Sequence, residues 1–401
     1  MTISGLSPAL PQAPAYGRSS IGDVFTSAAA AQGVPGFSNT LGLPPAKRIA
    51  VVLVDGLGKA LLRQRAGHAP FLRSAMAAAQ SHGHTQTLSA AFPSTTVTSL
   101  SSLGTGVDPG QHGMVGYDVL DPERDRVVNL LGNWDAGVDP LRWQPFPTVF
   151  ERLAGHVATV TVSLPKFADS AMTRAALRGS TFLAATTPQA RTQLAAKTLS
   201  GADSMLLYLY WSELDKAGHR YGTSSPQWEH QLEELDSSMR RLSRALPPDT
   251  LLLLTADHGM VDIPVAQRVD YSAEPALVDG VRHTAGEPRM VHLYLEPDAG
   301  EERQRRLLAA WRERYGRQAW ILTRAEAVAA GYFGAVRAEV LPRIGDILIA
   351  AREPIAFYDT RRTSPSALEV VGQHGSITKA EREVPLLRIA TGTTSDGGRR
   401  G

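Results

Sequence analysis

The sequence predicts an α/β protein whose core is a doubly wound, mostly parallel β-sheet. Apolar segments that stop abruptly, such as IAVVLV at 49–54, alternate along the chain with alanine-rich segments of helical periodicity. Near-continuous apolar runs of this length are typical of strands that helices bury on both faces. Their alternation with helices favours a parallel sheet. At 401 residues, 43% of them hydrophobic and 20% charged, the chain is long enough for a large core.

The alternation of strands and helices starts near Lys47. Residues 1–46 are rich in Pro, Gly, Ser and Ala, so we expect an irregular N-terminal arm, with one helix around 21–32, that packs on the core. Beyond it, apolar runs predict strands and longer alanine-rich stretches predict helices. The expected strands are 49–54, 157–163, 205–211 and 250–255, and the expected helices are 58–79, 146–155, 188–200 and 226–245, with a Ser/Thr-rich segment at 94–106.

A change of pattern after Asp262 predicts a small α+β insertion over 266–343. This stretch contains the alternating segment MVHLYLEP, the helical segment EERQRRLLAAWRERYG and the short strand AWILT. Arginine is dense in the helical segment, but the glutamates mixed into it favour a solvated face over an anion-binding one. The remaining divisions are a strand at 346–353 that returns to the core, a metallohydrolase core over 47–265 and 344–392, and a disordered tail at 393–401.

Composition and charge exclude several classes of function. The chain has no cysteine, which excludes disulfides, thiolate metal ligands, a cysteine nucleophile and a cysteine-derived formylglycine. Its net charge of +2 is close to balance, so we expect neither nucleic acid nor a membrane surface as its main partner. No stretch reaches the roughly 18 apolar residues of a membrane span. Residues 1–20 lack the basic and apolar regions of a secretory signal, so we expect a cytoplasmic protein.

Acidic and histidine side chains stand at the ends of the predicted strands. The pattern places Asp55 after IAVVLV, Asp215 and His219 after MLLYLYW, and Asp257 and His258 after TLLLLT. In an open α/β sheet the carboxyl ends of the strands border the ligand-binding crevice, so these side chains can converge there. Asp and His suit Zn²⁺, and an Asp/His mixture divided between two ions is typical of hydrolytic sites.

Each of these positions also has a structural explanation. Asp55 precedes glycines that permit a tight turn, and Asp is a favoured helix cap. Asp215 and His219 are four residues apart, so one helical turn brings them to the same face, as ligands of one ion or as a surface pair. Asp257 and His258 are adjacent and reach one ion only if the backbone turns, which the following glycine permits. An adjacent Asp–His pair at the end of a buried strand is hard to explain by packing.

A further histidine ligand is expected late in the chain. His374, in VVGQHGSIT, follows a short apolar stretch and precedes a glycine. A lone loop histidine is more often incidental, so this assignment depends on the rest of the set. Its competitors are His283 and His292, and His292 lies within the alternation MVHLYL, which favours a packed strand residue.

A hydroxyl nucleophile is expected in the segment 91–106, AFPSTTVTSLSSLGTG. Ser and Thr often cap helices, which explains such a segment without catalysis. A hydroxyl at a helix N-terminus also lies beside free N–H groups and the positive end of the helix dipole, where a phosphate is favoured. A metal ion at that oxygen would lower its pKa. The capping role and the catalytic role are therefore compatible.

Together these motifs resemble the alkaline phosphatase superfamily and, within it, the nucleotide pyrophosphatase/phosphodiesterase branch. The resemblance comprises VDG, the threonine segment leading to TG and HG, DxxxH, DHG and the late HG, over roughly 47–262 and 343–390. It implies an alkaline-phosphatase-like core and a hydrolase with two zinc ions, or another divalent metal such as Mn²⁺. It also implies cleavage of phosphodiesters or pyrophosphates through a phospho-threonine intermediate, with a small-molecule phosphate ester as the partner.

The resemblance also assigns the individual residues. In that branch the nucleophilic Thr lies nine residues before the Thr of the Thr-Gly pair and sixteen before the His of the His-Gly pair. Counting back from Thr105 and from His112 gives Thr96, with Thr95 and Thr98 as alternatives. The implied ligands are Asp215, His219 and His374 for one zinc ion, and Asp55, Thr96, Asp257 and His258 for the other.

Two departures from the branch concern substrate binding. Its Thr-Phe-Pro-Asn segment becomes TVTS here, so the aromatic residue that helps to hold a nucleotide base is replaced by Val97. The Asn that helps to bind a phosphoryl oxygen falls by count at Tyr117. We expect Tyr117 or Asn133 to take its place.

Other functions are compatible with parts of this pattern. A phosphomonoesterase, a phosphonate hydrolase or a phosphomutase would keep the same fold and metals. A metal-stabilised binding protein without catalysis is disfavoured by the complete ligand set and the available threonine. A sulfatase is disfavoured because no C/S-x-P-x-R motif occurs.

Overall fold

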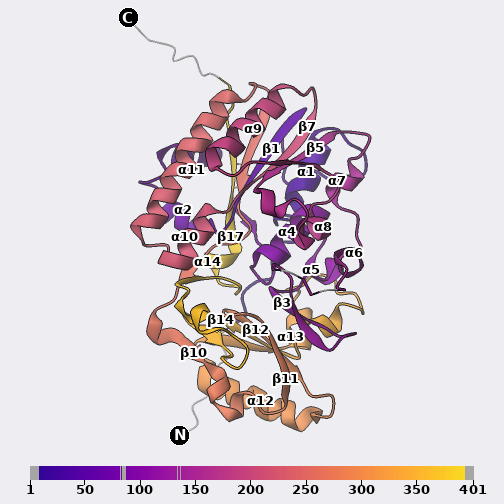
Figure 1. Ribbon diagram of the computed structural model, residues 1–401, viewed down its shortest axis with the longest axis vertical. Coiled ribbons are helices and arrows are strands. Elements are labelled where there is room, and N and C mark those ends of the chain that lie inside the picture. The colour runs from indigo at the N-terminus through magenta and orange to yellow at the C-terminus, as the bar shows by residue number, and fades with distance from the viewer. Residues whose placement is uncertain (1–8, 82, 84–86, 133, 136, 393–401) are drawn as a thin grey trace, which may run out of the picture.

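The computed structural model describes residues 9–81, 83, 87–132, 134–135 and 137–392. Within this part the chain forms a large unit around a seven-stranded sheet and a smaller unit around a four-stranded sheet. The two units follow one another along the long axis of the molecule (Figure 1). The tail expected at 393–401 lies outside the described residues. No helix among those described is long and apolar enough to cross a membrane.

The large sheet has the order β2-β17-β8-β1-β7-β5-β6. Its strands are β2 (Thr87–Ser89), β17 (Glu383–Ile389), β8 (Thr250–Thr255), β1 (Arg48–Val54), β7 (Met205–Trp211), β5 (Ala158–Ser163) and β6 (Thr181–Ala184). β8, β1, β7, β5 and β6 are parallel, whereas β17 runs antiparallel to both β8 and β2. The structure therefore confirms a doubly wound, mostly parallel sheet.

Helices cover both faces of this sheet (Figure 1). One face carries α2 (Lys59–Gln64), α3 (Pro70–Ser81), α9 (Pro188–Ser200), α10 (Glu213–Tyr221) and α11 (Pro226–Ala245). The other carries α1 (Asp23–Ala31), α4 (Thr96–Thr105), α7 (Val149–Arg152) and α8 (Ala171–Ala176). Because both faces are covered, consecutive residues of the central strands are buried, as Leu206 and Leu207 are.

Several elements differ from the sequence-based expectation. The helix expected over 58–79 is two helices, since the chain restarts at Pro70 after a turn. The helix expected over 146–155 shortens to α7, which begins after a capping box formed by Thr148 and Glu151. β6 and β17 were not expected, because β6 is short and only partly buried and β17 contains Pro385 and an arginine.

The smaller unit is built on an antiparallel sheet of order β11-β12-β14-β13. Its elements are β11 (Val281–Glu287), β12 (Met290–Leu295), β13 (Ala319–Thr323), β14 (Ile347–Ala351), α12 (Gly300–Tyr315) and α13 (Arg324–Ala329). The strand expected at 346–353 was assigned to the core, and this assignment is wrong, because β14 pairs with β12 and β13. Ile347 and Ile349 pack in the core of the small unit, whereas Leu348 and Ala350 join the main core. Burial on both faces made β14 look like a strand of the parallel sheet.

Short elements connect the two units. They are the hairpin β3 (Asp118–Asp121) and β4 (Arg126–Asn129), the pairs β9 (Val261–Asp262) with β16 (Gly372–Gln373) and β10 (Arg268–Asp270) with β15 (Ala356–Tyr358), and the helices α5 (Pro109–His112) and α6 (Pro140–Trp143). The last helix, α14 (Lys379–Arg382), packs on α2 and β17 of the large unit. The β3–β4 hairpin packs on β11 and β12, where Leu120 clusters with Ala285 of β11 and Tyr294 of β12. The hydroxyl of Tyr294 also accepts a hydrogen bond from the N–H of Leu120, at 3.3 Å.

Candidate metal centre and nucleophile

Three central strands end at the same edge of the large sheet. Val54 at the end of β1 lies opposite Trp211 at the end of β7, and Leu53 lies opposite Thr255 at the end of β8. The N–H of Asp55 continues the ladder by donating to the carbonyl of Trp211, at 2.8 Å. The acidic residues that follow these strands therefore meet in space, as the sequence predicts for the carboxyl edge of a parallel sheet.

Tight turns bring the acidic side chains together. Gly56 has a φ of +76°, and a Cβ there would lie 3.2 Å from the Cα of Asp215. Glycine thus permits both the left-handed turn after β1 and the close approach of α10. Asp257 is completely buried, and its Oδ1 accepts hydrogen bonds from the N–H of Gly56 at 3.2 Å and of His258 at 3.0 Å. These bonds fix Asp257 between the ends of β1 and β8.

All three predicted histidine ligands present the same ring atom to the site. Their Nδ1 atoms lie beside backbone carbonyl oxygens, which are Gly372 O at 2.7 Å for His219, Gly259 O at 3.0 Å for His258 and Ser94 O at 3.0 Å for His374. A carbonyl oxygen only accepts hydrogen bonds, so each Nδ1 must carry the proton. In the neutral imidazole this tautomer leaves a free lone pair on Nε2, the form in which imidazole binds a metal ion.

The lone pairs face carboxylate oxygens. The Nε2 of His258 lies 3.4 Å from Asp55 Oδ1 and 3.6 Å from Asp257 Oδ2, and the Nε2 of His219 lies 3.3 Å from Asp215 Oδ1. The ring of His374 stacks on that of His258 with centroids 3.6 Å apart, and the centroids of His374 and His219 are 5.2 Å apart. The structure therefore brings together all six Asp and His residues predicted from the sequence.

Two groups have a spacing that suits metal ions. The candidate ligand atoms of Asp55, Asp257 and His258 lie within 4.8 Å of one another, and so do those of Asp215, His258 and His374. His258 belongs to both groups and stands between them, whereas the resemblance assigns it to the first group alone. His219 adjoins the second group through Asp215.

The unpaired atoms of the site fit a cation. Asp215 Oδ1 and Asp257 Oδ2 are buried and have no hydrogen-bond partner among the described residues. Burial, together with the charges of Asp215 and Asp257, raises the pKa of Asp55 well above its ordinary value. Burial and the nearby Asp215 also raise the pKa of Asp257 to about 7. Crowded carboxylates and orphaned acceptors are what divalent cations compensate in proteins.

Thr96 is the first residue of α4 and lies beside this cluster. Its Oγ1 is 3.1 Å from the Nε2 of His258 and 3.4 Å from Asp55 Oδ1. The alternative nucleophiles Thr95 and Thr98 form no such contact within the described part of the chain, and neither hydroxyl caps α4. Thr95 occupies the N-cap position without a side-chain capping bond, and the hydroxyls of both residues have no hydrogen-bond partner among the described residues. The structure therefore distinguishes Thr96 from its two neighbours.

The competing histidines lie elsewhere. His292 is buried in β12, where its Nδ1 accepts a hydrogen bond from the N–H of Gly345 at 3.2 Å. His283 lies 2.9 Å from Asp125, outside the two Asp/His groups. Of the two residues expected to bind a phosphoryl oxygen, Asn133 lies outside the described residues. Tyr117 is partly buried beside the small unit, where burial raises the pKa of its hydroxyl.

A pocket of about 460 Å³ opens beside Thr96 and Asp55. Its wall includes Tyr210, whose hydroxyl donates a hydrogen bond to the second carboxylate oxygen of Asp55. Lys166 and Lys216 also line it and are exposed. These three residues were not predicted from the sequence. Successive side chains of a strand point to opposite faces of a sheet, so the position of Tyr210 in β7 indicates only which face of the sheet its side chain lies on. The pocket is positively charged where it meets solvent, while acidic groups lie at its base.

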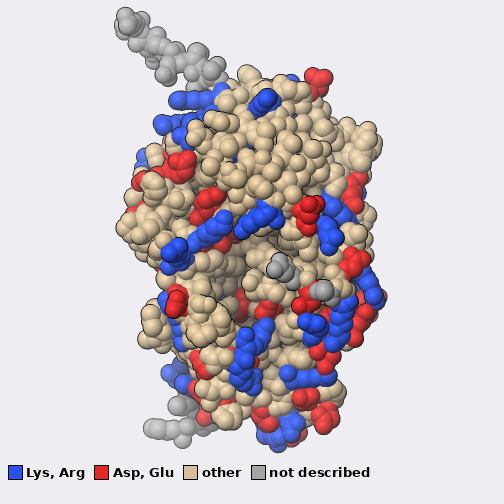
Figure 2. All heavy atoms as spheres, in the orientation of Figure 1, with Lys and Arg blue, Asp and Glu red and all other residues tan. Residues whose placement is uncertain are grey.

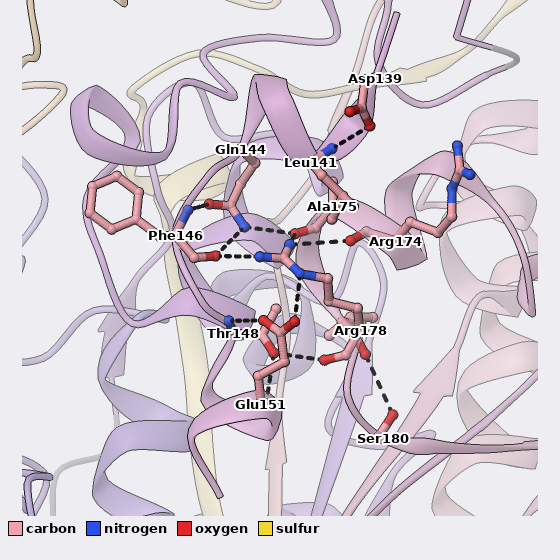
Figure 3. A network of polar contacts seen from close by, with 11 residues as sticks. Asp139, Leu141, Gln144, Phe146, Thr148, Glu151, Arg174, Ala175, Arg178 and Ser180 are labelled. Atoms are coloured by element: carbon pink, nitrogen blue, oxygen red, sulfur yellow. Dashed lines mark hydrogen bonds and ion pairs between the residues drawn. The ribbon is translucent and has the colours of Figure 1, made fainter. Parts of the chain in front are cut away.

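A polar network supports one wall of this pocket (Figure 3). Arg178 follows α8, and its Nε donates to Glu151 Oε1 at 2.9 Å while its two Nη atoms donate to the carbonyls of Phe146 at 2.6 Å and Ala175 at 2.8 Å. The amide of Gln144 donates to the same two carbonyls, at 3.0 and 2.8 Å. These bonds hold the end of α8, and residues of α8 line the pocket.

The surface view shows how charged side chains are distributed on one face of the molecule (Figure 2). Figure 2 shows a hollow in the middle of this face, between the upper and the lower part of the molecule. Lys and Arg side chains lie along its rim and acidic side chains lie inside it. Such a distribution favours the approach of an anionic ligand to a site that can hold cations.

The sequence pattern of the type I phosphodiesterase/nucleotide pyrophosphatase family matches residues 49–377. The chain belongs to this family. Membership agrees with the alkaline phosphatase superfamily resemblance and makes the chain a member of a hydrolase family that acts on phosphoester bonds. A segment of 63 residues is also 33% identical to the catalytic subunit of GPI ethanolamine phosphate transferase 3 from Mus musculus. That segment is 16% of this chain and 6% of the mouse protein, so the chain spans only a small part of this relative.

Solved structures of family members and their relatives share the fold. Murine ectonucleotide pyrophosphatase/phosphodiesterase 5, solved in an inactive form with AMP, has a TM-score of 0.64 and 17% identity, with 85% of this chain and 88% of that chain covered. Phosphonoacetate hydrolase from Sinorhizobium meliloti 1021, solved with phosphonoacetate, also has a TM-score of 0.64, with 18% identity and with 87% and 91% covered. At these identities the likeness establishes the fold.

Proposed function

We propose that the chain is a two-zinc phosphoric ester hydrolase of the phosphodiesterase/nucleotide pyrophosphatase type that acts through a phospho-threonine intermediate on Thr96. The observation that carries the proposal is the position of Thr96 Oγ1, 3.1 Å from His258 Nε2 and 3.4 Å from Asp55 Oδ1, in a cluster of buried Asp and His residues. Mn²⁺ is the alternative metal, because the same donor types accept it.

The residues of the site perform two displacements at phosphorus. In the first, the Thr96 hydroxyl loses its proton as Oγ1 forms a bond to phosphorus, the bond from phosphorus to the leaving-group oxygen breaks, and the leaving group departs as an alcohol that carries a proton. In the second, a water oxygen displaces Thr96 Oγ1, one proton of that water restores the Thr96 hydroxyl, and the phosphate product is released. Asp55 Oδ1 accepts a hydrogen bond from the Thr96 hydroxyl and so aims its oxygen into the pocket. Divalent cations held by the Asp/His groups would supply Lewis-acid stabilisation of the charge on the attacking and leaving oxygens.

Substrate selection belongs to the pocket and to the segment after α5. We place the leaving group in the 460 Å³ pocket, with Lys166 and Lys216 at its solvent side. Tyr117 or Asn133 is proposed to contact the phosphoryl oxygen in place of the missing Asn. Val97 replaces an aromatic residue of the nucleotide pyrophosphatase/phosphodiesterase branch. A nucleotide base therefore has no aromatic side chain to stack on at that position.

A phosphonate hydrolase is the second candidate function. The observation that favours it is the pair of lysines in the pocket, since two exposed ammonium groups suit a leaving group with an anionic substituent of its own. The relative from Sinorhizobium meliloti was solved with phosphonoacetate, which has such a group. Both candidates use the same metal centre and the same nucleophile.

A metal analysis combined with a substrate comparison tests the proposal. We expect close to two zinc ions per chain by elemental analysis of the purified protein. Turnover of an aryl phosphodiester should exceed that of the matching aryl phosphomonoester, and both should stop after chelation and return with Zn²⁺. One ion or none with full activity would refute the two-metal centre. Faster turnover of phosphonoacetate than of the diester would select the second candidate.

A further inference from the structure

We propose that the buried ion pair between Arg289 and Glu381 is a positioning device that sets the distance between the two metal-binding loops of the proposed metal centre. The proposal rests on the function proposed above and adds two residues that neither bind metal nor touch the pocket. Arg289 stands in the turn between β11 and β12 of the small unit, and Glu381 stands in α14 of the large unit. Both side chains are completely buried.

Arg289 is held rigidly. Its Nε and Nη2 donate to the two carboxylate oxygens of Glu381, each at 2.8 Å. Its Nη1 donates to the carbonyls of Glu353 and Ile355, each at 2.9 Å. A bidentate contact of this kind fixes the direction of the carboxylate as well as its charge, which lysine cannot do.

Glu381 in turn holds both histidine loops. Its Oε1 also accepts a hydrogen bond from the N–H of Ser376, at 3.0 Å, two residues after His374. Its backbone carbonyl accepts a hydrogen bond from the N–H of Gly259, at 2.7 Å, the residue after His258. One residue thus contacts the backbone behind two histidines whose rings stack with centroids 3.6 Å apart.

The contact with Gly259 leaves no space for adjustment. A Cβ at Gly259 would lie 2.0 Å from the carbonyl oxygen of Ala380, so the loop and α14 pack backbone against backbone. Ser376 is also fixed, because its hydroxyl donates to the carbonyl of Ala351 at 2.5 Å and its own carbonyl accepts from the Ser94 hydroxyl at 2.5 Å. A shift of Glu381 would therefore move the His258 and His374 loops.

A stabilising role alone does not explain this arrangement. A buried ion pair contributes little net stability, because removing both charges from water offsets their attraction. A fixed geometry can instead increase metal affinity, because the residues that contact the ligands from behind determine how well the ligands fit the ion. Arg289 would act on His258 and His374 through Glu381, and it would tie the small unit to the site.

The test compares stability with metal affinity. Arg289→Met should weaken Zn²⁺ binding, measured by competition with a chromophoric chelator, by about 10–100-fold, as for other groups behind metal ligands. The double variant Arg289→Met, Glu381→Met removes both charges and should recover the melting temperature of the metal-free protein, while its Zn²⁺ affinity stays low. Arg324→Met is the control, because the Arg324–Asp346 pair lies in the small unit away from the loops. It should leave Zn²⁺ affinity unchanged.

The outcomes separate the two roles. If the double variant regains Zn²⁺ affinity together with its melting temperature, the pair serves stability alone and the inference is overturned. If Arg289→Met does not fold, Arg289→Lys serves instead, and it must weaken Zn²⁺ binding more than Arg324→Lys does. A wild-type chain that binds no Zn²⁺ would overturn the proposed function and the inference with it. Unchanged affinity in every variant would overturn only the inference.

Discussion

Replacing Thr96 by alanine, beside matched changes at Thr98, tests the nucleophile directly. The two threonines lie in the first turn of α4 and are similarly buried, with exposed fractions of 5% and 0%. They differ in their contacts. The Thr96 hydroxyl lies within 3.4 Å of both Asp55 and His258, whereas the Thr98 hydroxyl has no partner among the described residues. The pair therefore separates a loss of chemistry from a loss of packing.

The magnitudes follow from these contacts. Thr96→Ala removes the hydroxyl that would form the covalent intermediate, so turnover should fall by at least about 10³-fold, which is roughly 4 kcal/mol of transition-state stabilisation. Its stability cost should be only about 1–3 kcal/mol, from a lost methyl group and lost polar contacts. Thr98→Val replaces an unpaired buried hydroxyl by a methyl group of similar shape. It should leave stability unchanged or raise it by up to about 1–3 kcal/mol, with turnover nearly unchanged.

The assay is steady-state turnover of an aryl phosphodiester, followed by acid quenching and mapping of the phosphorylated residue. Thr96→Ser should keep partial activity, because the oxygen remains and only the methyl group that restricts its rotamer is lost. Zinc content and melting temperature should confirm that Thr96→Ala remains folded. A phosphate mapped to Thr95 or Thr98, or full activity in Thr96→Ala, would refute the reasoning.

Two further predictions concern histidines. His374→Ala should lose one zinc ion and most of the activity, whereas His292→Ala should keep both ions; elemental analysis decides, and the reverse result would move the ligand to β12. Burial lowers the pKa of His112 to about 3, so the folded chain holds it neutral. Neutral His112 contributes fully to the free energy of unfolding at pH values above its ordinary pKa of about 6.5. As the pH falls toward 3 this contribution decreases, and at about pH 5 the loss is roughly 2 kcal/mol. Urea unfolding should show a flatter pH dependence in His112→Gln, and equal slopes in both proteins would contradict this.

The sequence predicted the parts of the site that depend on local pattern. Asp55 and Asp257 end apolar runs, so the geometry of a parallel sheet was enough to bring them together. His374 has no such pattern around it and was found through family resemblance and motif order. Tyr210 and Arg289 were missed, because their roles depend on contacts with Asp55 and Glu381 that are distant in sequence. Local pattern indicates where a strand ends, but it does not indicate which side chain reaches that end from elsewhere.

The entry and exit of the small unit explain how the last ligand reaches the site. The chain leaves the large unit through β9 and returns through β16, and these strands pair so that Asp262 lies opposite Gly372. His374 follows at once, and the Nδ1 of His219 donates to the carbonyl of Gly372. Two contacts fix the position of His374: the pairing of β9 with β16 at the base of the insertion, and the β-bridge between Ser94 and Gly375. About a hundred residues can therefore be inserted between β9 and β16 without moving His374. Loop closure at this base costs little more for a long insertion than for a short one, because the entropy cost grows only with the logarithm of length. The small unit therefore reaches the site at a second point besides β16, the β11–β12 turn that carries Arg289, and its sequence is constrained at both.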